Sequence, residues 1–319
     1  MSKNKSLLKI IITTLFFFIQ ATFINNLAAK DSHVDCKTDT QNAFDNRICT
    51  ERSISEQYLV LIPHKPNYFI GSHVKDIVNT NADYDSFESK FQISFKTPLS
   101  NYKKGYRCLW FDNTECYTFF AYTQISVWQT LNFDNSAPFR DTNFEPELII
   151  TQFLDRELFS DWRLRQIDYG LANHQSNGKT PPFSRSWNRS YIDATIGNDQ
   201  HYITLKYWQR WNEAPKTQPS DFKGDDNPFI EDYIGNYELK YIYAGNLTNY
   251  SIVVRDSEKN ENNINYELNW SYPLNRLALF DKSKLRFYVQ YFNGFGETLI
   301  DYDVMRRRLG AGIMLADWF

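Results

Sequence analysis

The amino-acid sequence predicts an all-β protein, an antiparallel transmembrane β-barrel of about twelve strands. The first observation is a repeated alternation of apolar and polar residues, as in "KFQISFK", "NYELKYIYAG" and "KLRFYVQYF". The second is that the opposite faces of these segments are polar, as with Arg286 and Gln290, which suits a wet barrel interior. The third is a final segment whose apolar row runs to Phe319. Alternating segments of this kind, aromatic at their ends, are typical of barrels that cross a membrane with strands.

The same alternation also fits a soluble β-sandwich or a lipocalin. Two features favour the membrane barrel over these alternatives. The strands look long for a sandwich, and the faces opposite the apolar rows are unusually polar. Beyond the N-terminal segment, no apolar run is long enough for a membrane helix.

The first 29 residues read as a secretory signal peptide. A basic start with Lys3 and Lys5 precedes an apolar core, and Ala28 and Ala29 are small residues suited to cleavage. A single membrane-anchoring helix is the alternative, but polar residues such as Gln20 interrupt the run before it reaches a spanning length. We therefore expect an exported protein, with residues 30–66 as an N-terminal periplasmic extension and residues 67–319 as the barrel.

The charge balance argues against a nucleic-acid partner. The chain carries 35 basic and 38 acidic residues, a formal net charge of −3, and loss of the lysine-containing leader makes it more negative. A protein that binds nucleic acid usually carries a basic patch or stripe, and none is evident here.

The four cysteines fall into two local pairs, Cys36 with Cys49 and Cys108 with Cys116. In an oxidising compartment such pairs more often form structural disulfides than metal sites. Four cysteines allow three connectivities, and the local pairing is the one that we favour.

The sequence has no Pro/Ser-rich linker, no low-complexity tract and no close internal repeat, so we expect one domain after the short N-terminal extension. We expect the strands near residues 67–75, 87–99, 116–130, 144–157, 160–176, 186–197, 200–213, 231–244, 246–256, 264–273, 283–293 and 303–319. An even number of antiparallel strands closed into a ring leaves no unpaired edge in lipid.

The stretch "NHQSNG" places an imidazole and a hydroxyl two residues apart. In an extended strand, residues i and i+2 point to the same face, so His174 and Ser176 would lie side by side as a base and a potential nucleophile. Taken alone, most His-x-Ser pairs are ordinary surface or pore-lining polar residues.

Two longer tracts are too specific for the pairing of His174 with Ser176 to be a coincidence. They are "YGLANHQSNGKTPPFSRSWNR" from Tyr169 and "YTQISVWQTLNFDNSAPFRDTNFEPEL" from Tyr122. Together with "IPHKPNYFI", "DDNP" and "GETLIDYD", they make the chain resemble the bacterial outer membrane phospholipase A family, from about Ile54 to Phe319. The resemblance implies a twelve-stranded, multi-pass barrel in the bacterial outer membrane. It also implies a calcium-dependent, dimeric phospholipase A that hydrolyses acyl esters of membrane phospholipids and lysophospholipids.

The resemblance assigns catalytic roles to five residues. Ser176 would attack the ester carbonyl, and His174 would take its proton and return it to the leaving alcohol. Asn188 on the next strand would hold the imidazole, although an amide cannot stabilise an imidazolium as a carboxylate does. The backbone N–H of Gly178 would face the oxyanion, and Gln124 matches a family position that supports the asparagine. On sequence alone, a lumen-facing polar role for Gln124 is equally acceptable.

The calcium ligands implied by the resemblance are oxygens. They are the carbonyl of Lys179, where the family often has arginine, the hydroxyl of Ser184 and, from the other subunit, Ser136. A second calcium position of the family uses an acid where this chain has Pro181, although its partner Asp226 is kept. We therefore do not expect the second site.

The facing of the strand at the catalytic pair raises a difficulty. Ile167, Tyr169 and Leu171 occupy odd positions, whereas His174 and Ser176 are even. If the odd positions face lipid, a regular strand would turn the catalytic pair into the lumen. A β-bulge between Gly170 and Asn173 would reverse the facing, and glycine with asparagine is suitable for one.

Two other functions are compatible with parts of the pattern. One is a passive barrel channel whose His174 and Ser176 merely line the pore. The other is a secreted soluble β-protein that binds carbohydrate through its aromatic residues. A channel predicts ion conductance without lipid hydrolysis, and a soluble binder predicts extraction without detergent.

Overall fold

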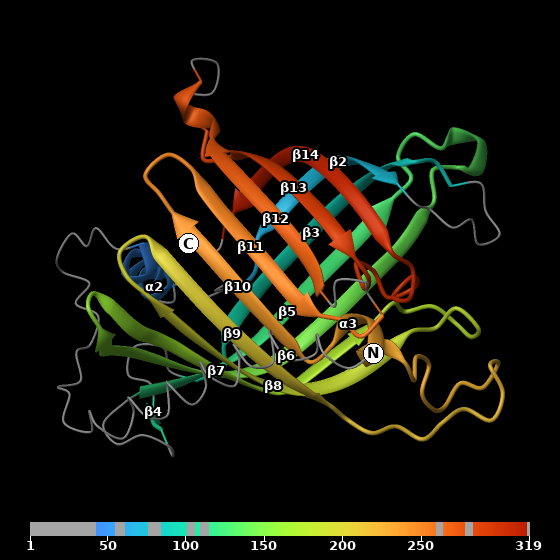
Figure 1. Ribbon diagram of the computed structural model, residues 1–319, viewed down its shortest axis with the longest axis horizontal. Coiled ribbons are helices and arrows are strands. Elements are labelled where there is room, and N and C mark those ends of the chain that lie inside the picture. The colour runs from blue at the N-terminus through green and yellow to red at the C-terminus, as the bar shows by residue number, and fades with distance from the viewer. Residues whose placement is uncertain are drawn as a thin grey trace.

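The strands of the chain curve into a closed barrel, shown as a computed structural model in Figure 1. The structure describes residues 43–54, 61–75, 84–100, 106–108, 115–259, 264–277 and 283–317. The predicted signal peptide and Cys36 lie outside these residues.

Twelve long antiparallel strands form the wall of the barrel, as the sequence predicts. Hydrogen bonding of β14 to β2 and of β3 to β5 closes the ring. Two short strands, β1 (Ile62–Pro63) and β4 (Tyr106–Arg107), pair beside the ends of β3 and β5. The long strands are β2 (Asn67–Lys75), β3 (Phe87–Pro98), β5 (Glu115–Trp128), β6 (Phe139–Phe159), β7 (Trp162–Ser176), β8 (Ser186–Gly197), β9 (His201–Arg210), β10 (Tyr237–Ala244), β11 (Asn249–Asp256), β12 (Ile264–Pro273), β13 (Arg286–Gly294) and β14 (Arg306–Ala316).

The predicted bounds are confirmed for β2, β8 and β12 and need correction at residues 231–244. A short helix, α3 (Ile230–Ile234), takes the first part of that segment, and β10 begins only at Tyr237. Ile230 and Ile234 stand one helical turn apart and are both buried in a core cluster with Leu299. The strand predicted from residue 231 is therefore wrong over its first residues, because Ile230 and Ile234 follow a helical spacing. Gly235, with φ 75°, ends the helix, since its N–H bonds back to the Glu231 carbonyl.

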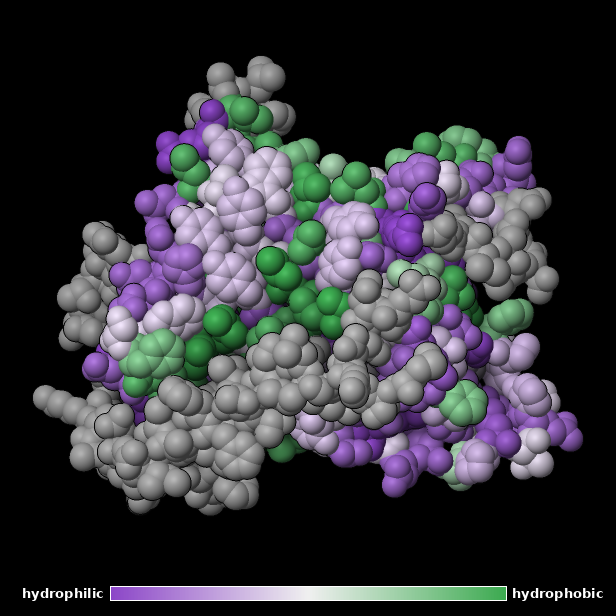
Figure 2. Space-filling view, viewed as in Figure 1, coloured by the Kyte–Doolittle hydropathy of each residue, from purple (hydrophilic) through white to green (hydrophobic). Residues whose placement is uncertain are grey.

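The outer surface of the wall is apolar. Side chains such as Ile252, Leu268 and Leu309 stand on it and are exposed. Figure 2 shows hydrophobic side chains, with pale aromatic rings beside them, on the outer surface over β10 to β14. This is the surface expected of a barrel in contact with lipid.

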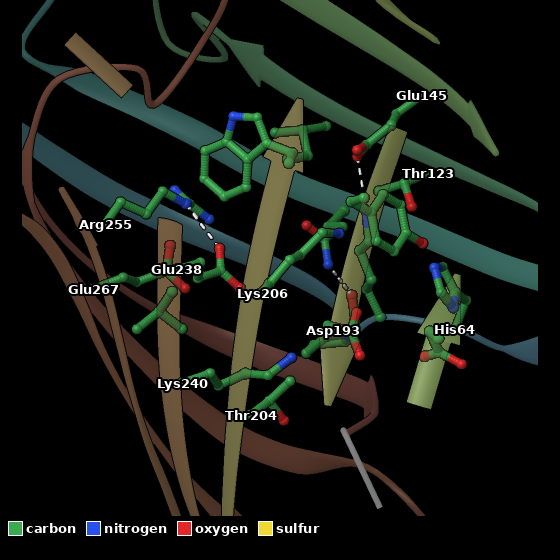
Figure 3. A pocket seen from close by; sticks show the side chains of 18 of the residues that line it. His64, Thr123, Glu145, Asp193, Thr204, Lys206, Glu238, Lys240, Arg255 and Glu267 are labelled. Atoms are coloured by element: carbon green, nitrogen blue, oxygen red, sulfur yellow. Dashed lines mark hydrogen bonds and ion pairs between the residues drawn. The ribbon is translucent and has the colours of Figure 1, made fainter. Parts of the chain in front are cut away.

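The interior is polar and encloses a cavity of about 250 Å³. Lys65 lies 2.8 Å from Glu145 and 2.9 Å from Glu147, and Arg255 lies 2.8 Å from Glu238. Figure 3 shows Glu145, Glu238 and Arg255 pointing into the cavity from different strands. At these contacts opposite charges are paired, which offsets part of the cost of burying them in a low-dielectric interior.

Both ends of the barrel are filled by chain segments. At one mouth, helix α2 (Ala43–Ile54) packs Phe44 and Ile48 against Tyr202, and Lys96 pairs with Glu51 at 3.0 Å. At the other end, the connection between β13 and β14 inserts Glu297, which lies 2.7 Å from Arg308. No helix among the described residues is long and apolar enough to cross a membrane. The remaining short elements are the turns η1 (Phe133–Asn135) and η2 (Leu274–Arg276).

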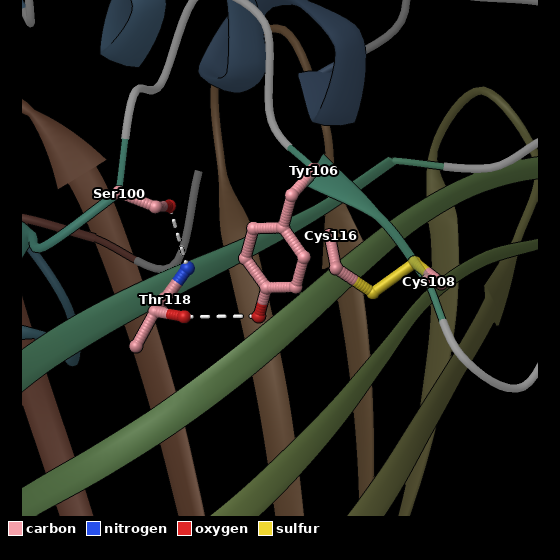
Figure 4. Close-up of a disulfide and its surroundings, with 5 residues drawn as sticks. All are labelled: Ser100, Tyr106, Cys108, Cys116 and Thr118. Atoms are coloured by element: carbon pink, nitrogen blue, oxygen red, sulfur yellow. Dashed lines mark hydrogen bonds between the residues drawn. A yellow bond between two sulfur atoms is a disulfide. The ribbon is translucent and has the colours of Figure 1, made fainter.

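One of the two predicted disulfides is confirmed. Cys108 and Cys116 are joined, with their Cα atoms 5.3 Å apart, where β4 meets β5 (Figure 4). Cys49 is also disulfide-bonded, but its predicted partner Cys36 lies outside the described residues.

Candidate active site

A β-bulge at Leu171 turns the strand that carries His174 and Ser176. Gly170 pairs with Tyr191 and Asn173 with Arg189, so β7 has one residue more than β8 between these pairs. The same shift occurs against β6, where Ile149 pairs with Gly170 and Leu148 with Ala172. The predicted bulge is thus confirmed.

The bulge decides which side chains face lipid. Before it, Gln166 and Asp168 line the lumen, and after it, Gln175 does. His174 and Ser176 therefore point to the outer surface, where Leu171 is also exposed. Gly170 is needed at this turn because a Cβ there would lie 2.1 Å from the ring of Tyr191.

The imidazole of His174 is held from the neighbouring strand. His174 pairs with Asn188 in the register of β7 and β8, and its Nδ1 lies 2.8 Å from Asn188 Oδ1. Ser176 is partly exposed on the same face. Within the described residues, no hydrogen bond joins its hydroxyl to the ring; catalytic contacts of this kind commonly tighten only when substrate binds.

The NH₂ group of the Asn188 amide contacts Glu213, a residue that the sequence pattern does not predict. Asn188 Nδ2 donates to Glu213 Oε1 at 3.1 Å, and the Trp211 N–H donates to the Asn188 carbonyl at 2.8 Å. Both residues follow directly after β9. The pattern "YWQRWNE" contains no signal for this contact, because it depends on the pairing of β8 with β9.

Gln124 lies on the outer face of β5, between the lumen-lining residues Thr123 and Ile125. It accepts a hydrogen bond from Tyr122 Oη at 3.1 Å and donates to Ser126 Oγ at 3.1 Å. Strands β6 and β7 stand between it and β8. Among the described residues, the structure therefore brings Gln124 into a polar row of β5 and not into contact with Asn188.

The loop after Ser176 is folded around the buried side chain of Asn177. Its Oδ1 accepts the N–H of Arg185 at 2.9 Å and that of Lys179 at 3.3 Å, and its Nδ2 donates to the Phe183 carbonyl at 3.0 Å. Gly178 follows with φ 64°, in the left-handed region that favours glycine. These bonds fix Gly178 and Lys179 next to Ser176.

The side chain of Lys179 is bound within the protein. The ammonium donates to the Arg140 carbonyl at 2.7 Å and lies 3.9 Å from Asp141. Burial lowers the pKa of Lys179, and the Asp141 carboxylate partly opposes this. The Lys179 carbonyl accepts no hydrogen bond from a described residue.

Ser184 contacts the carboxylate of Asp226. Ser184 Oγ donates to Asp226 Oδ2 at 2.7 Å, and Ser186 Oγ lies 3.3 Å from the same oxygen. The other oxygen of Asp226 pairs with the ammonium of Lys216. Ser136 is exposed, directly after η1, in the connection between β5 and β6 at the same end of the barrel. The described part of the chain has no group of three or more His, Cys, Asp or Glu that could hold a metal.

Comparison with known proteins adds to this geometry. The family model described as phospholipase A1 matches residues 44–315. The phospholipase A1 of Proteus vulgaris is 32% identical over 301 residues, covering 91% of this chain and 93% of that protein.

Solved structures agree in fold and in sequence. Outer membrane phospholipase A from Escherichia coli superposes with a TM-score of 0.69 at 32% identity, covering 88% of this chain and 100% of that one. The same values hold for its active-site mutant, in which an asparagine is replaced by alanine. The outer membrane phospholipase of Salmonella typhi, solved as a dimer with bound calcium, gives a TM-score of 0.68 at 32% identity and covers 84% of this chain and 98% of that one. The chain therefore belongs to the phospholipase A1 family and is a phospholipase A that spans the outer membrane as a twelve-stranded β-barrel.

Proposed function

We propose that this phospholipase A cleaves acyl esters with a Ser176–His174–Asn188 triad, that it requires calcium and that it acts as a homodimer. The observation that carries the triad is the 2.8 Å contact between His174 Nδ1 and Asn188 Oδ1 on the outer face of the barrel. Because an amide oxygen only accepts, Nδ1 carries a proton and Nε2 presents its lone pair. His174 can then remove the proton of Ser176 as that hydroxyl attacks the ester.

The orientation of the site supports a membrane substrate. His174 and Ser176 open onto the lipid-facing surface, and the exposed side chains of Leu171 and Phe183 lie in the flanking segments. An acyl chain of a phospholipid or lysophospholipid can therefore reach Ser176 without leaving its apolar surroundings. His174 returns the proton of Ser176 to the alcohol as its bond to the acyl carbon breaks, and water then attacks the acyl-Ser176 ester, which releases the fatty acid and restores the Ser176 hydroxyl.

The oxyanion needs donors that the triad does not supply. In the proposal, the backbone N–H of Gly178 is one donor, since the hydrogen bonds of Asn177 hold this loop next to Ser176. Calcium, when bound, adds a positive charge beside the oxyanion.

The residues around Ser184 fit such an ion. The Ser184 hydroxyl donates its hydrogen bond to Asp226, which leaves the lone pairs of Oγ for a cation, and the Lys179 carbonyl accepts no hydrogen bond from a described residue. Hydroxyl and carbonyl oxygens are ligands that calcium accepts. We do not propose a second ion at Asp226, because Lys216 already supplies a positive charge there.

Pairing of two subunits has its own support in the outer surface. Tyr122, Gln124 and Ser126 form a hydrogen-bonded row that ends at Thr142, 3.2 Å from Ser126. A polar row is costly against lipid tails and is better placed against protein. We propose that a second copy covers it and that Ser136 of the partner subunit completes the calcium shell. The calcium-bound dimer of the Salmonella typhi relative is consistent with both parts of the proposal.

The decisive experiment measures phospholipid hydrolysis by detergent-refolded protein with calcium or with chelator. Ser176→Ala should remain folded and lose activity by at least about 10³-fold. A serine-directed phosphonate should label only the protein that has Ser176, and Ser53→Ala, on α2, is the matched control. Equal labelling of Ser176→Ala would show that another residue is the nucleophile. Full activity in excess chelator would show that hydrolysis does not require calcium.

A further inference from the structure

We propose that Glu213 is a positioning residue for this reaction: its carboxylate fixes the orientation of the Asn188 amide and, through it, the tautomer of His174. The inference rests on the triad proposed above. It starts from a run of two contacts, 3.1 Å from Glu213 Oε1 to Asn188 Nδ2 and 2.8 Å from Asn188 Oδ1 to His174 Nδ1.

The donors and acceptors of Glu213, Asn188 and His174 fix the direction of both hydrogen bonds. A carboxylate only accepts hydrogen bonds, so the end of the amide that faces Glu213 must be the NH₂ group. The oxygen of the amide is then left for the imidazole, and Nδ1 of His174 must donate to it. Nε2 is consequently the unprotonated nitrogen, which is the state that a base for Ser176 needs.

Without the carboxylate, the Asn188 amide loses the contact that favours this orientation over the flipped one. A flipped amide would present its NH₂ group to Nδ1, which would then accept, and Nε2 would carry the proton. That tautomer cannot take the proton of Ser176. A carboxylate partner also polarises the amide, which strengthens the bond from its oxygen to the ring.

Glu213 is held in place from both sides along the chain. On one side, the Trp211 N–H bonds to the Asn188 carbonyl at 2.8 Å. The Trp211 indole donates to Ser190 Oγ at 2.9 Å, and Ser190 Oγ donates at 2.9 Å to the carbonyl of Leu171 in the bulge. On the other side, Ala214 accepts the N–H of Asp225 at 2.8 Å. The loop, the bulge and the triad are thus parts of one hydrogen-bonded unit.

A purely structural role does not explain the carboxylate. Acids that hold the fold together elsewhere pair with arginine, as buried Glu88 does with Arg308 at 2.7 Å and partly exposed Asp225 does with Arg210 at 2.5 Å. Among the described residues, the hydrogen bond of the Glu213 carboxylate goes to Asn188 and no ion pair holds it. Glu213 therefore binds the amide that contacts the imidazole of His174.

The test compares Glu213→Ala, Glu213→Gln and the same-loop control Asp221→Ala in the full-length, refolded protein. Glu213→Ala should lower kcat by about 10-fold to 100-fold with little change in KM, because it alters the base and leaves the lipid surface intact. Glu213→Gln keeps an acceptor oxygen but can also flip, so it should recover part of the loss. Asp221→Ala should match the unmodified protein.

A double-mutant cycle separates positioning from general damage. In an Asn188→Ala background, Glu213→Ala should have no further effect on kcat or on phosphonate labelling, since the amide that it orients is gone. Additive losses, or full activity of Glu213→Ala while Ser176→Ala is inactive, would overturn the inference but keep the triad. Activity of Ser176→Ala would instead overturn the proposed function on which the inference rests.

Discussion

The two faces of the wall at β7 and β8 use opposite chemistry. Toward the lumen, the largely buried Arg189 lies 2.9 Å from Glu145 and donates to Asn173 at 2.7 Å. On the opposite face of the same two strands, toward lipid, stand the neutral groups Asn188 and Ser176. Charges can be paired inside the barrel, but a charge on the lipid face has few partners.

This difference gives a reason for the amide in the proposed triad. A carboxylate at position 188 would face the apolar surface, whereas Glu213 lies in the loop beyond the end of β9, partly exposed. The negative charge of Glu213 thus lies further from lipid than a carboxylate at position 188 would, and the Asn188 amide stands between it and His174. The contrast between the lumen face and the lipid face makes specific predictions for variants on both faces.

Deletion of Leu171 should have the largest effect. Without the bulge residue, a regular β7 would turn His174 and Ser176 into the lumen and Asn173 and Gln175 outward. Lipid hydrolysis should fall below detection, whereas Leu171→Ala, which keeps the residue count, should remain active. Circular dichroism in detergent checks that both variants keep their β-structure, and a folded deletion variant with normal turnover would contradict the facing argument.

Asn188→Ala should lower turnover less than Ser176→Ala does, because the nucleophile, the base and the oxyanion donors survive. We expect a loss of about 10-fold to 100-fold in kcat, measured with a short-chain phospholipid in mixed micelles. Unchanged activity would mean that another residue holds the imidazole.

Ser184→Ala should raise the calcium concentration required for half-maximal hydrolysis by about 10-fold or more, since one proposed ligand is lost. Ser186→Ala is the matched control, because its hydroxyl contacts the same carboxylate without being a proposed ligand. Asp226→Ala should have an intermediate effect, as it removes the group that orients Ser184. Equal calcium requirements for all three variants would place the ion elsewhere.

Arg308→Met should leave hydrolysis nearly unchanged and lower stability. Arg308 is fully buried between Glu88 and Glu297, each at 2.7 Å. Removing one partner of a buried ion pair commonly costs about 3–5 kcal/mol. The thermal midpoint in detergent should therefore fall clearly, while turnover per folded molecule at low temperature should stay the same. A selective loss of turnover would show that the lumen network acts on the site.

The pH dependence of stability should report the same network through Glu297. Burial alone would raise the pKa of this carboxyl, but Arg308 and Lys90 outweigh burial and hold the pKa below its ordinary value of 4.5. The ionised form is therefore favoured in the folded barrel, and its contribution is complete above pH 4.5 and is lost as the pH falls toward the lower folded value. Glu297→Gln should flatten this acid decline in the thermal midpoint, and an identical decline in both proteins would assign it to other groups.

Much of the architecture was available from the sequence because strand alternation is a local property. The apolar rows determined the bounds of β2, β8 and β12, and the conflict of parity at His174 was enough to infer the bulge at Leu171. The tracts around Asn188 and Ser136 led to the family, which makes a passive channel or a soluble sugar-binding protein the wrong interpretation.

Other features depend on contacts between segments that are distant in the sequence, and local patterns do not predict such contacts. Helix α2 occupies a mouth of the barrel because Phe44 meets Tyr202, and α3 replaces predicted strand because Ile230 and Ile234 are buried beside Leu299. The contact of Glu213 with Asn188 likewise appears only once β9 lies beside β8. Alternation tells which way a strand residue points, but a loop residue has no such period, so its partner is decided by the closed barrel alone.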